Sequence, residues 1–295
     1  MIPPQSNPVR AAFWMLGAMV SFTSMAVAGR EIAYQLDTFE LMTYRSLIGI
    51  VVVLTVGGFS RTLGQINTRD LPLHAIRNAS HFAGQNLWFF AVTLIPFAQL
   101  FAFEFSTPIW VALFAPLVLK EKLTGTRLFA ALLGFIGILI VARPEVSGLN
   151  VGVIAAIVAA FGFTGAVLAT KILTRSHSVT NILFWLTVMQ AVFGLTLAGY
   201  DGDIALPTAA TWPLVIVVGF AGLFAHLCIT RALTLAPAII VSPMDFGRLP
   251  MIALIGMFFY AEPLEWQIIL GALIVLGANL LNINAERRLA TVPPL

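Results

Sequence analysis

The feature that most constrains this chain is a succession of apolar runs, each about 20 residues long, separated by short polar segments. A helix needs about 20 predominantly apolar residues to cross a bilayer. The sequence is 59% hydrophobic and 10% charged, and a water-soluble fold of this size could not bury so much apolar surface. We therefore predict an all-α membrane protein whose ten spans lie near residues 11–29, 38–58, 72–94, 97–119, 126–142, 150–170, 179–199, 212–230, 238–260 and 264–283.

The second half of the sequence repeats the first at a constant offset. AVTLIP at 91–96 returns as ALTLAP at 232–237, and the difference between these positions defines the repeat offset (232 − 91 = 141). Other pairs at this offset are Phe22-Thr23 with Phe163-Thr164, Ala28 with Ala169, Arg30 with Lys171, Pro72-Leu73 with Pro213-Leu214, Glu104 with Asp245, Glu121 with Glu262, and Leu123 with Leu264. We interpret this pattern as a tandem duplication with its boundary in 143–149, which gives repeats at 1–147 and 148–295.

Each repeat is predicted to hold five spans. Because five is odd, the second repeat enters the membrane from the side opposite to the first. The expected fold is therefore two inverted five-helix repeats around a central cavity, an arrangement typical of secondary transporters.

The positive charges test this topology. With a cytoplasmic N-terminus, eleven of the sixteen Lys and Arg residues fall on the cytoplasmic side. Only Arg30 and Arg143 lie in outer loops, and Arg45, Arg77 and Arg248 lie within spans. This positive-inside bias predicts that both termini are cytoplasmic. The net charge of +3 therefore reflects orientation in a lipid bilayer, and no nucleic-acid partner is expected.

Short segments of both halves carry a family resemblance. They are Leu94-Ile95-Pro96, Leu119-Lys120-Glu121-Lys122-Leu123 and Gly134-Phe135-Ile136-Gly137 in the first half, and Leu235-Ala236-Pro237, Ala261-Glu262-Pro263-Leu264 and Leu276-Gly277 in the second. With them the sequence resembles the drug/metabolite transporter superfamily, EamA type, with one EamA unit in each half. The resemblance implies ten helices around a central cavity, termini inside, and movement of a metabolite or amino acid, mostly export, without ATP hydrolysis. It also implies that the fifth and tenth helices are peripheral and suit a homodimer contact.

The third predicted span is unusually polar. It contains His74, Arg77, Asn78, His81, Gln85 and Asn86. Positions 74, 78, 81 and 85 share one helix face, and such a polar stripe cannot face lipid. It either lines the cavity or forms a hydrogen-bond ladder between helices. His81 lies near mid-membrane and is the first candidate for contact with a substrate or a proton.

Depth in the membrane suggests pairs of buried charges. Glu104 and Arg45 lie at similar depth below the outer surface and could neutralise each other. Asp245 and Arg248 are three residues apart on one helix face, with Arg77 as a competing partner. These groups are interpreted as gates or proton-coupling carboxylates, or else as static bridges. The arginines could instead bind a carboxylate or phosphate of the substrate.

Three further features bear on the site. Phe22 and Phe163 are related by the repeat and should lie at matching depths, where they and Trp88 could stack on a flat substrate. Pro108, Pro116, Pro243 and Pro250 predict bent, mobile fourth and ninth spans. Glu121 and Glu262 lie at the membrane edge, where helix capping explains them without a transport role.

These observations predict a secondary transporter, expected to be an exporter of amino acids, aromatic ones included, or of related metabolites. It works by alternating access in the cell inner membrane. The expected substrate-binding residues are Arg77, His81, Gln85, Trp88, Phe22 and Phe163, and the coupling or gating residues are Glu104, Asp245, Arg45 and Arg248.

Other function classes stay open. One is a transporter of phosphorylated or nucleotide-linked solutes, one an intramembrane enzyme using His81 with Glu104, and one a non-transporting receptor or scaffold. No Walker loop, dinucleotide fingerprint, HExxH or paired-cysteine site occurs in the sequence, so no enzyme activity, metal or cofactor is expected.

Overall fold

The computed structural model describes residues 6–32, 35–92, 94–95, 97–142, 150–200, 203–248, 251, 254, 257–258 and 266–290. Within these ranges the regular elements are α-helices and short 3-10 helices, and none of these residues lies in a β-strand. The all-α class predicted from the apolar runs is confirmed.

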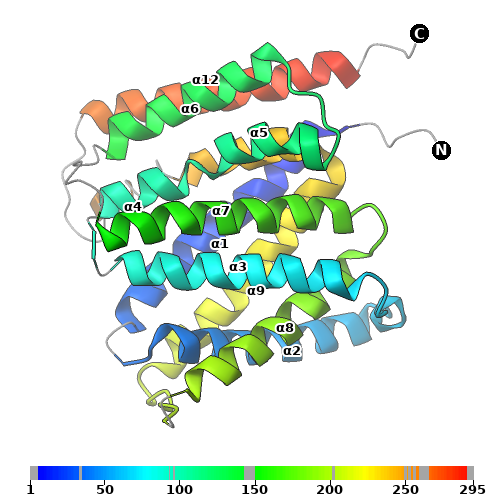
Figure 1. Ribbon diagram of the computed structural model, residues 1–295, viewed down its shortest axis with the longest axis vertical. Coiled ribbons are helices and arrows are strands. Elements are labelled where there is room, and N and C mark those ends of the chain that lie inside the picture. Colours follow the sequence, from blue (N-terminus) through cyan, green and yellow to red (C-terminus); the bar gives the residue numbers. More distant parts are fainter. Residues whose placement is uncertain are drawn as a thin grey trace.

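Helices follow one another along both halves of the chain (Figure 1). The first half contains α1 Pro8–Ile32, α2 Thr38–Phe59, η1 Leu63–Gln65, α3 Leu71–Val92, α4 Phe97–Glu104, α5 Thr107–Val118 and α6 Gly125–Ala142. The second contains α7 Val151–Leu173, α8 Val179–Ala198, α9 Trp212–Leu235, α10 Ala238–Val241, η2 Ser242–Gly247 and α12 Trp266–Ala290.

The duplication is visible in the positions where helices begin. The starts of α2, α3, α4 and α6 differ from those of α8, α9, α10 and α12 by the repeat offset in every case. The signals that start α2 and α8 are repeat-related too. Asp37 accepts a hydrogen bond from the backbone N–H of Glu40 at 2.8 Å, and Ser178 accepts one from Asn181 at 3.2 Å. Such N-caps satisfy backbone donors that a helix leaves unpaired at its first turn.

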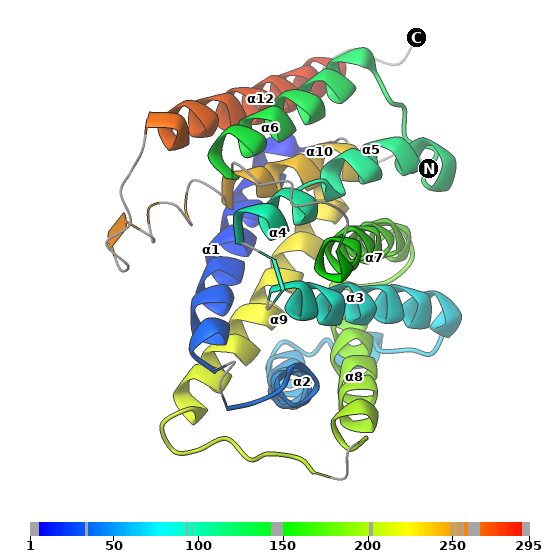
Figure 2. The same cartoon turned by 60° about the vertical axis from the view of Figure 1, so that its left-hand side comes forward.

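The two repeats pack against each other through equivalent pairs of helices. Helix α1 packs along α9, and α3 packs along α7, which is the same pair with the repeats exchanged (Figure 2). The helices α2 and α8 pack together at one end of the molecule, and α6 and α12 pack together at the other. Two repeats related by a pseudo-twofold axis must pack through such equivalent helix pairs.

Glycines allow α3 and α7 to approach closely. A Cβ atom on Gly162 would lie 2.7 Å from the carbonyl oxygen of Ser80 and 2.8 Å from the Cα of Gly84. Both neighbours are backbone atoms, so no side chain at Gly162 fits without moving a helix. Small residues at such crossings are the usual means of close helix packing in a bilayer.

Several helices have the dimensions of membrane spans. Among the described residues, α1, α2, α7, α8 and α9 are long and apolar enough to cross a bilayer. Helix α3 has 22 residues, and its polar stripe lowers its hydropathy. Helices α6 and α12 contribute shorter apolar segments, Gly125–Ile140 and Ile269–Ala285.

The fourth predicted span is broken in the middle. Helix α4 ends at Glu104, and α5 begins at Thr107 with Pro108 in its first turn. Because proline has no N–H and its ring needs room, the helix restarts there. The bend expected from Pro108 is therefore present.

The ninth predicted span is irregular as far as the structure describes it. It starts with α10 and continues as the 3-10 helix η2, with Pro243 in the first turn of η2. Most of the segment between Arg248 and Trp266, including Pro250 and Glu262, lies outside the described residues, as does the predicted repeat boundary at 143–149.

Helix ends that were predicted on the same side of the membrane contact neighbouring segments of that side. The Lys171 ammonium donates to the carbonyl oxygens of Leu233 and Ala236 at 2.6 and 2.8 Å. On the other side, the hydroxyl of Tyr44 donates to the carbonyl oxygen of Ala205 at 2.7 Å. Each of these contacts joins two segments that the predicted topology places on the same side of the membrane.

Candidate functional site

The polar stripe of α3 lies inside the helix bundle. His74 and Asn78 are completely buried, and Arg77, His81 and Gln85 are nearly so. Ile76, on the opposite side of α3, is 60% exposed. Burial of one polar face and exposure of the apolar face is the orientation expected of a helix in lipid.

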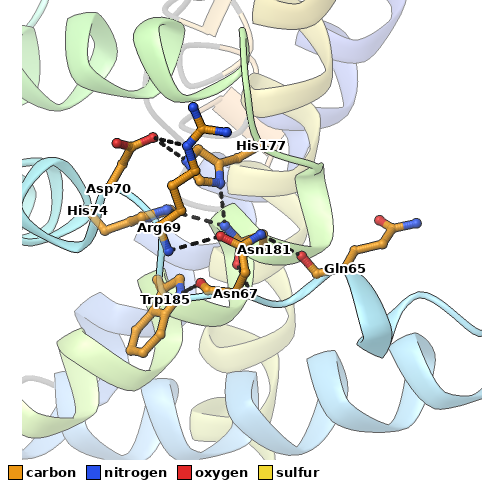
Figure 3. A network of polar contacts seen from close by, with 8 residues as sticks. All are labelled: Gln65, Asn67, Arg69, Asp70, His74, His177, Asn181 and Trp185. Carbon is orange, nitrogen blue, oxygen red and sulfur yellow. Dashed lines mark hydrogen bonds and ion pairs between the residues drawn. The ribbon is translucent and has the colours of Figure 1, made fainter.

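The first half of the stripe forms a hydrogen-bond ladder with α8 and the loop before it (Figure 3). The Asn181 amide donates to His177 Nδ1 at 2.8 Å and contacts His74 Nε2 at 3.4 Å. His177 Nε2 bonds to the Asp70 carboxylate at 2.9 Å. An amide nitrogen can only donate, so Nδ1 of His177 is the acceptor and its Nε2 carries the hydrogen.

Arg77 is engaged by three protein side chains. Its Nε donates to Thr170 Oγ1 at 3.1 Å, and its Nη1 donates to Asn78 Oδ1 at 2.7 Å. Its Nη2 bonds to His226 Nδ1 at 3.3 Å. Arg77 thus joins α3 to α7 and α9. The expectation that it competes for Asp245 is wrong, because its bonds go to these three side chains.

Four side-chain rings lie close together near Arg77. They come from α1, α9, α3 and α7, the helices of the two equivalent pairs. The His81 ring on α3 lies 4.6 Å from the His226 ring on α9 and 6.0 Å from the Phe163 ring on α7. Phe22 on α1 lies 5.9 Å from His226. We call Phe22, His81, Phe163 and His226 the ring cluster.

His226 of the ring cluster and Gln85, one helical turn after His81 on α3, have hydrogen-bonding groups without partners in the described part of the chain. Arginine only donates, so His226 Nδ1 accepts from Arg77 and its Nε2 carries the hydrogen. That Nε2–H is buried and has no hydrogen-bond partner among the described residues, and the same holds for Gln85 Oε1. Gln85 and His226 are related by the repeat offset. Other buried polar atoms of the described residues also have no partner, Asp245 Oδ1 and Arg248 Nε among them, but Gln85 Oε1 and His226 Nε2 stand at repeat-related positions.

A second buried cluster contains the intramembrane carboxylates. The Arg248 guanidinium bonds to Glu104 and, at 3.1 Å, to Asp245. The indole N–H of Trp88 donates to Glu104 Oε2 at 2.7 Å. We call Trp88, Glu104, Asp245 and Arg248 the carboxylate cluster. The predicted bond between Asp245 and Arg248 is present.

The predicted pairing of Glu104 with Arg45 is wrong. Glu104 bonds instead to Arg248, which belongs to the other repeat. Arg45 is buried on α2, with its Nη1 3.4 Å from the sulfur of Met42. Its guanidinium occupies the space beside Gly222, where a Cβ atom would lie 2.6 Å from Nε. Equal depth in the membrane says nothing about which side of a helix a residue faces, and this is why the pairing failed.

Phe22 connects the two clusters. Its ring contacts His226 on one side, and the Arg248 guanidinium lies 5.3 Å from its centroid on another. Phe105 contacts the same guanidinium at 5.0 Å. An arginine held between two rings and two carboxylates is strongly constrained in position.

Glu121 has a structural role. Its two carboxylate oxygens accept hydrogen bonds from the backbone N–H groups of Ala238 and Ile239 at 3.0 and 3.2 Å. Glu121 thus caps the first turn of α10, in agreement with the capping interpretation.

Some residues of the site were not singled out from the sequence. They are His226 and Thr170, which bind Arg77, and Gln190, whose amide contacts His81 Nδ1 at 3.4 Å. The repeat offset held a signal for His226, because it aligns that residue with Gln85. Among the described residues, no three His, Cys, Asp or Glu side chains gather closely enough to hold a metal ion.

The fold and these buried clusters define a multi-pass membrane protein with a polar site between two repeats, as in secondary transporters. The chain belongs to the EamA-like transporter family, which matches residues 9–143 and 150–284. The family resemblance read from the sequence is confirmed, and the protein is a membrane transporter of small molecules of the drug/metabolite transporter type.

Several relatives are named transporters. The chain is 32% identical over 219 residues to a riboflavin transporter of Brucella anthropi, covering 73% of this chain and 77% of that protein. It is 23% identical over 275 residues to an S-adenosylmethionine uptake transporter of Rickettsia felis, covering 93% and 92% of the two chains. A solved crystal structure superposes with a TM-score of 0.80 over 95% of this chain and 98% of the other, at 16% identity, and so shares the fold.

Proposed function

We propose that this protein is a secondary transporter of planar nitrogen heterocycles, flavins first among them, and that it works by alternating access in the cell inner membrane. The observation that carries this proposal is the ring cluster, with the unpaired donor of His226 and the unpaired acceptor of Gln85 one turn after His81 on α3. Alternating access is supported by the position of the ring cluster, to which both repeats contribute equivalent helices.

The chemistry of the ring cluster and of Gln85 supports this substrate class. Aromatic side chains favour stacking on a flat ring system. The His226 Nε2–H suits a carbonyl oxygen, and the Gln85 Oε1 atom suits an N–H group. A flavin ring carries both groups and stacks well. Riboflavin and S-adenosylmethionine, the named substrates of the two relatives, both contain a planar nitrogen heterocycle.

Amino acids, the substrate expected from the sequence, are less well supported. A zwitterion needs a cation for its carboxylate and an anion for its ammonium group. Arg77 and Glu104 are each bound to protein partners, which an amino acid would have to displace. A phosphorylated solute meets the same difficulty at Arg77. The enzyme alternative is weakened because His81 and Glu104 belong to different clusters.

The carboxylate cluster suits proton coupling. Two carboxylates share the Arg248 guanidinium, which leaves one excess negative charge if both are ionised. A buried uncompensated charge is costly, so uptake of one proton by the carboxylate cluster is the expected neutralisation. Phe22 touches both clusters and would transmit substrate occupancy to Arg248.

The orientation and assembly are part of the proposal. The positive charges favour cytoplasmic termini. Exposed apolar side chains on α6 and α12, such as Phe129 and Leu273, suit either lipid or a second copy. We propose a homodimer through these peripheral helices.

A transport assay tests the substrate class. Purified protein in liposomes loaded with riboflavin should exchange labelled riboflavin without ATP. Labelled amino acids are tested in parallel, and inside-out and outside-in gradients test the predicted export against uptake. Exchange of amino acids without exchange of riboflavin or of an adenine-containing solute would overturn the substrate class.

His81→Ala tests the ring cluster. Removing this ring eliminates contacts to both His226 and Phe163, so we expect riboflavin exchange to fall at least ~10-fold. Thr196→Val is the matched control, because the Thr196 hydroxyl bonds to carbonyl groups of its own helix. Both variants should retain the wild-type elution profile in detergent. Undiminished exchange by a folded His81→Ala protein would contradict this site.

A further inference from the structure

Two side chains of α8 form hydrogen bonds to the backbone of a single residue, Asn67 (Figure 3). The Asn181 Oδ1 atom accepts a hydrogen bond from the backbone N–H of Asn67 at 2.9 Å. The Trp185 indole N–H donates to the carbonyl oxygen of the same residue at 2.7 Å. Asn181 and Trp185 are one helical turn apart on α8, so both groups of Asn67 are held from one face of that helix. We call this arrangement the Asn67 clamp.

A second arrangement of the same design involves Ala205. The Glu40 Oε1 atom accepts a hydrogen bond from the backbone N–H of Ala205 at 2.5 Å. The Tyr44 hydroxyl donates to the carbonyl oxygen of Ala205 at 2.7 Å. Glu40 and Tyr44 are again one turn apart, on α2. We call this arrangement the Ala205 clamp.

The two clamps are related by the duplication. The repeat offset carries Glu40 onto Asn181, and it carries Tyr44 onto Trp185. In each clamp the second helix of one repeat holds the loop between the second and third helices of the other repeat. The residue types differ, but the acceptor and the donor occupy the same two positions.

The clamps lie on opposite faces of the molecule. Thr43, near the start of α2, faces Gly194, near the end of α8. Thr62, just after α2, bonds to Thr180 at the start of α8. Helices α2 and α8 therefore run antiparallel. Each clamp is at the N-terminal end of its own helix. One clamp therefore ties the repeats together on each side of the ring cluster.

The supports behind the clamps differ. Asn181 also bonds to His177, and His177 bonds to Asp70, which has a backbone φ of 58°. Glu40 instead closes a capping box with the backbone N–H of Asp37 at 2.8 Å. The two clamps share no side chain, so a substitution can remove a hydrogen bond from one clamp and leave the bonds of the other in place.

We propose that the Asn67 clamp and the Ala205 clamp are the two opposed latches of the transport cycle, each closing one face of the protein. This inference rests on the proposed alternating-access mechanism. To open one face, the repeats must separate there, and the clamp on that face must release while the other persists. Weakening one latch then shifts the population toward the conformation open on that side.

Single hydrogen-bond deletions in each latch provide the test. Trp185→Phe removes the donor of the Asn67 clamp, and Tyr44→Phe removes the donor of the Ala205 clamp. Cys228 is the one cysteine of the sequence, so Cys228→Ala gives a cysteine-free background. A reporter cysteine is then introduced by Gln85→Cys beside the ring cluster. Its labelling by a membrane-impermeant thiol reagent is measured in right-side-out and in inside-out vesicles.

We expect opposite sidedness. Trp185→Phe should raise the rate of labelling about two- to tenfold when the reagent is on the side of the membrane where the Asn67 clamp lies. Tyr44→Phe should raise it by the same factor when the reagent is on the side of the Ala205 clamp. Both factors correspond to the loss of one hydrogen bond. Asn181→Ala serves as a second variant of the Asn67 clamp. Thr196→Val, on α8 but outside both clamps, should label like the background protein.

Two results would overturn the latches. One is that Trp185→Phe and Tyr44→Phe raise labelling from the same face. The other is that the folded Trp185→Phe, Asn181→Ala and Tyr44→Phe proteins all label like the background, which would make the clamps permanent ties. The labelling needs no substrate. If riboflavin is not exchanged, the labelling experiment still tests the latches. If riboflavin is exchanged normally, unchanged labelling would still overturn them.

Discussion

Arg248 determines the charge balance of the buried carboxylates. Its guanidinium is shared by Glu104 and Asp245, which come from different repeats, and it lies between the rings of Phe22 and Phe105. Removal of one member of such a buried group leaves the others without compensation. Replacement of a carboxylate by its amide is therefore more informative than removal of the arginine.

The variant Glu104→Gln tests proton coupling. The amide keeps the size of the side chain and an oxygen for the Trp88 indole, but it carries no exchangeable carboxyl proton. We expect accumulation driven by a pH gradient to fall at least ~10-fold, while riboflavin exchange at equal pH is retained within about threefold. Parallel liposome assays with and without a pH gradient measure the two activities. Equal loss of both, or of neither, would contradict a coupling role for Glu104.

At the scale of elements, the crossing of α3 and α7 positions half of the ring cluster. Gly84 and Gly162 bring these helices together beside His81 and Phe163. The crossing admits no side chain at Gly162, because the nearest atoms belong to the backbone of α3. The positions of the His81 and Phe163 rings therefore depend on the presence of glycine at position 162.

A pair of alanine substitutions tests this crossing. Gly162→Ala should destabilise the protein by about 1–3 kcal/mol, since it forces the helices apart. Gly277→Ala on α12 is the matched control, because apart from its own helical turns no atom of the described residues lies within 4 Å of the Cβ position there. Alanine favours a helix over glycine, so the control should be neutral or slightly stabilising. Thermal unfolding in detergent measures both, and equal melting temperatures would argue against the close crossing.

At the scale of the whole molecule, the contacts that matter run between the repeats. The helix pairs α1 with α9, α3 with α7, α2 with α8 and α6 with α12 each combine one helix from either half. A repeat alone would leave these faces and their polar groups unpaired in lipid. The protein should therefore behave as two complementary units.

Co-expression of residues 1–147 and 148–295 as separate chains tests this view. The two chains should co-purify through a tag on one of them and recover about a tenth or more of riboflavin exchange, while each chain alone should be degraded or aggregate. The intact protein is the reference. Full exchange by one half alone would contradict the assignment of the ring cluster to both repeats.

Much of the architecture could be predicted from the sequence. The apolar runs indicate the membrane helices, and the constant repeat offset indicates the duplication that reappears in the helix starts. The burial of His74, Asn78, His81 and Gln85 follows from their spacing, because polar groups on one face of a membrane helix must avoid lipid. The break in the fourth span follows from Pro108.

The partners of the buried groups could not be predicted in this way. Depth along the membrane matched Glu104 with Arg45, but the packing of the repeats brings Glu104 to Arg248. The link of Arg77 to His226, and the two clamps on Asn67 and Ala205, likewise join residues more than a hundred positions apart.

The sequence by itself therefore determined the membrane class, the duplication and the face of α3 that turns inward. These properties depend on local periodicity and on the cost of placing polar groups in lipid. The tertiary structure alone decided which polar groups meet, because hydropathy places a residue along the membrane normal but does not specify the rotation or the neighbours of its helix.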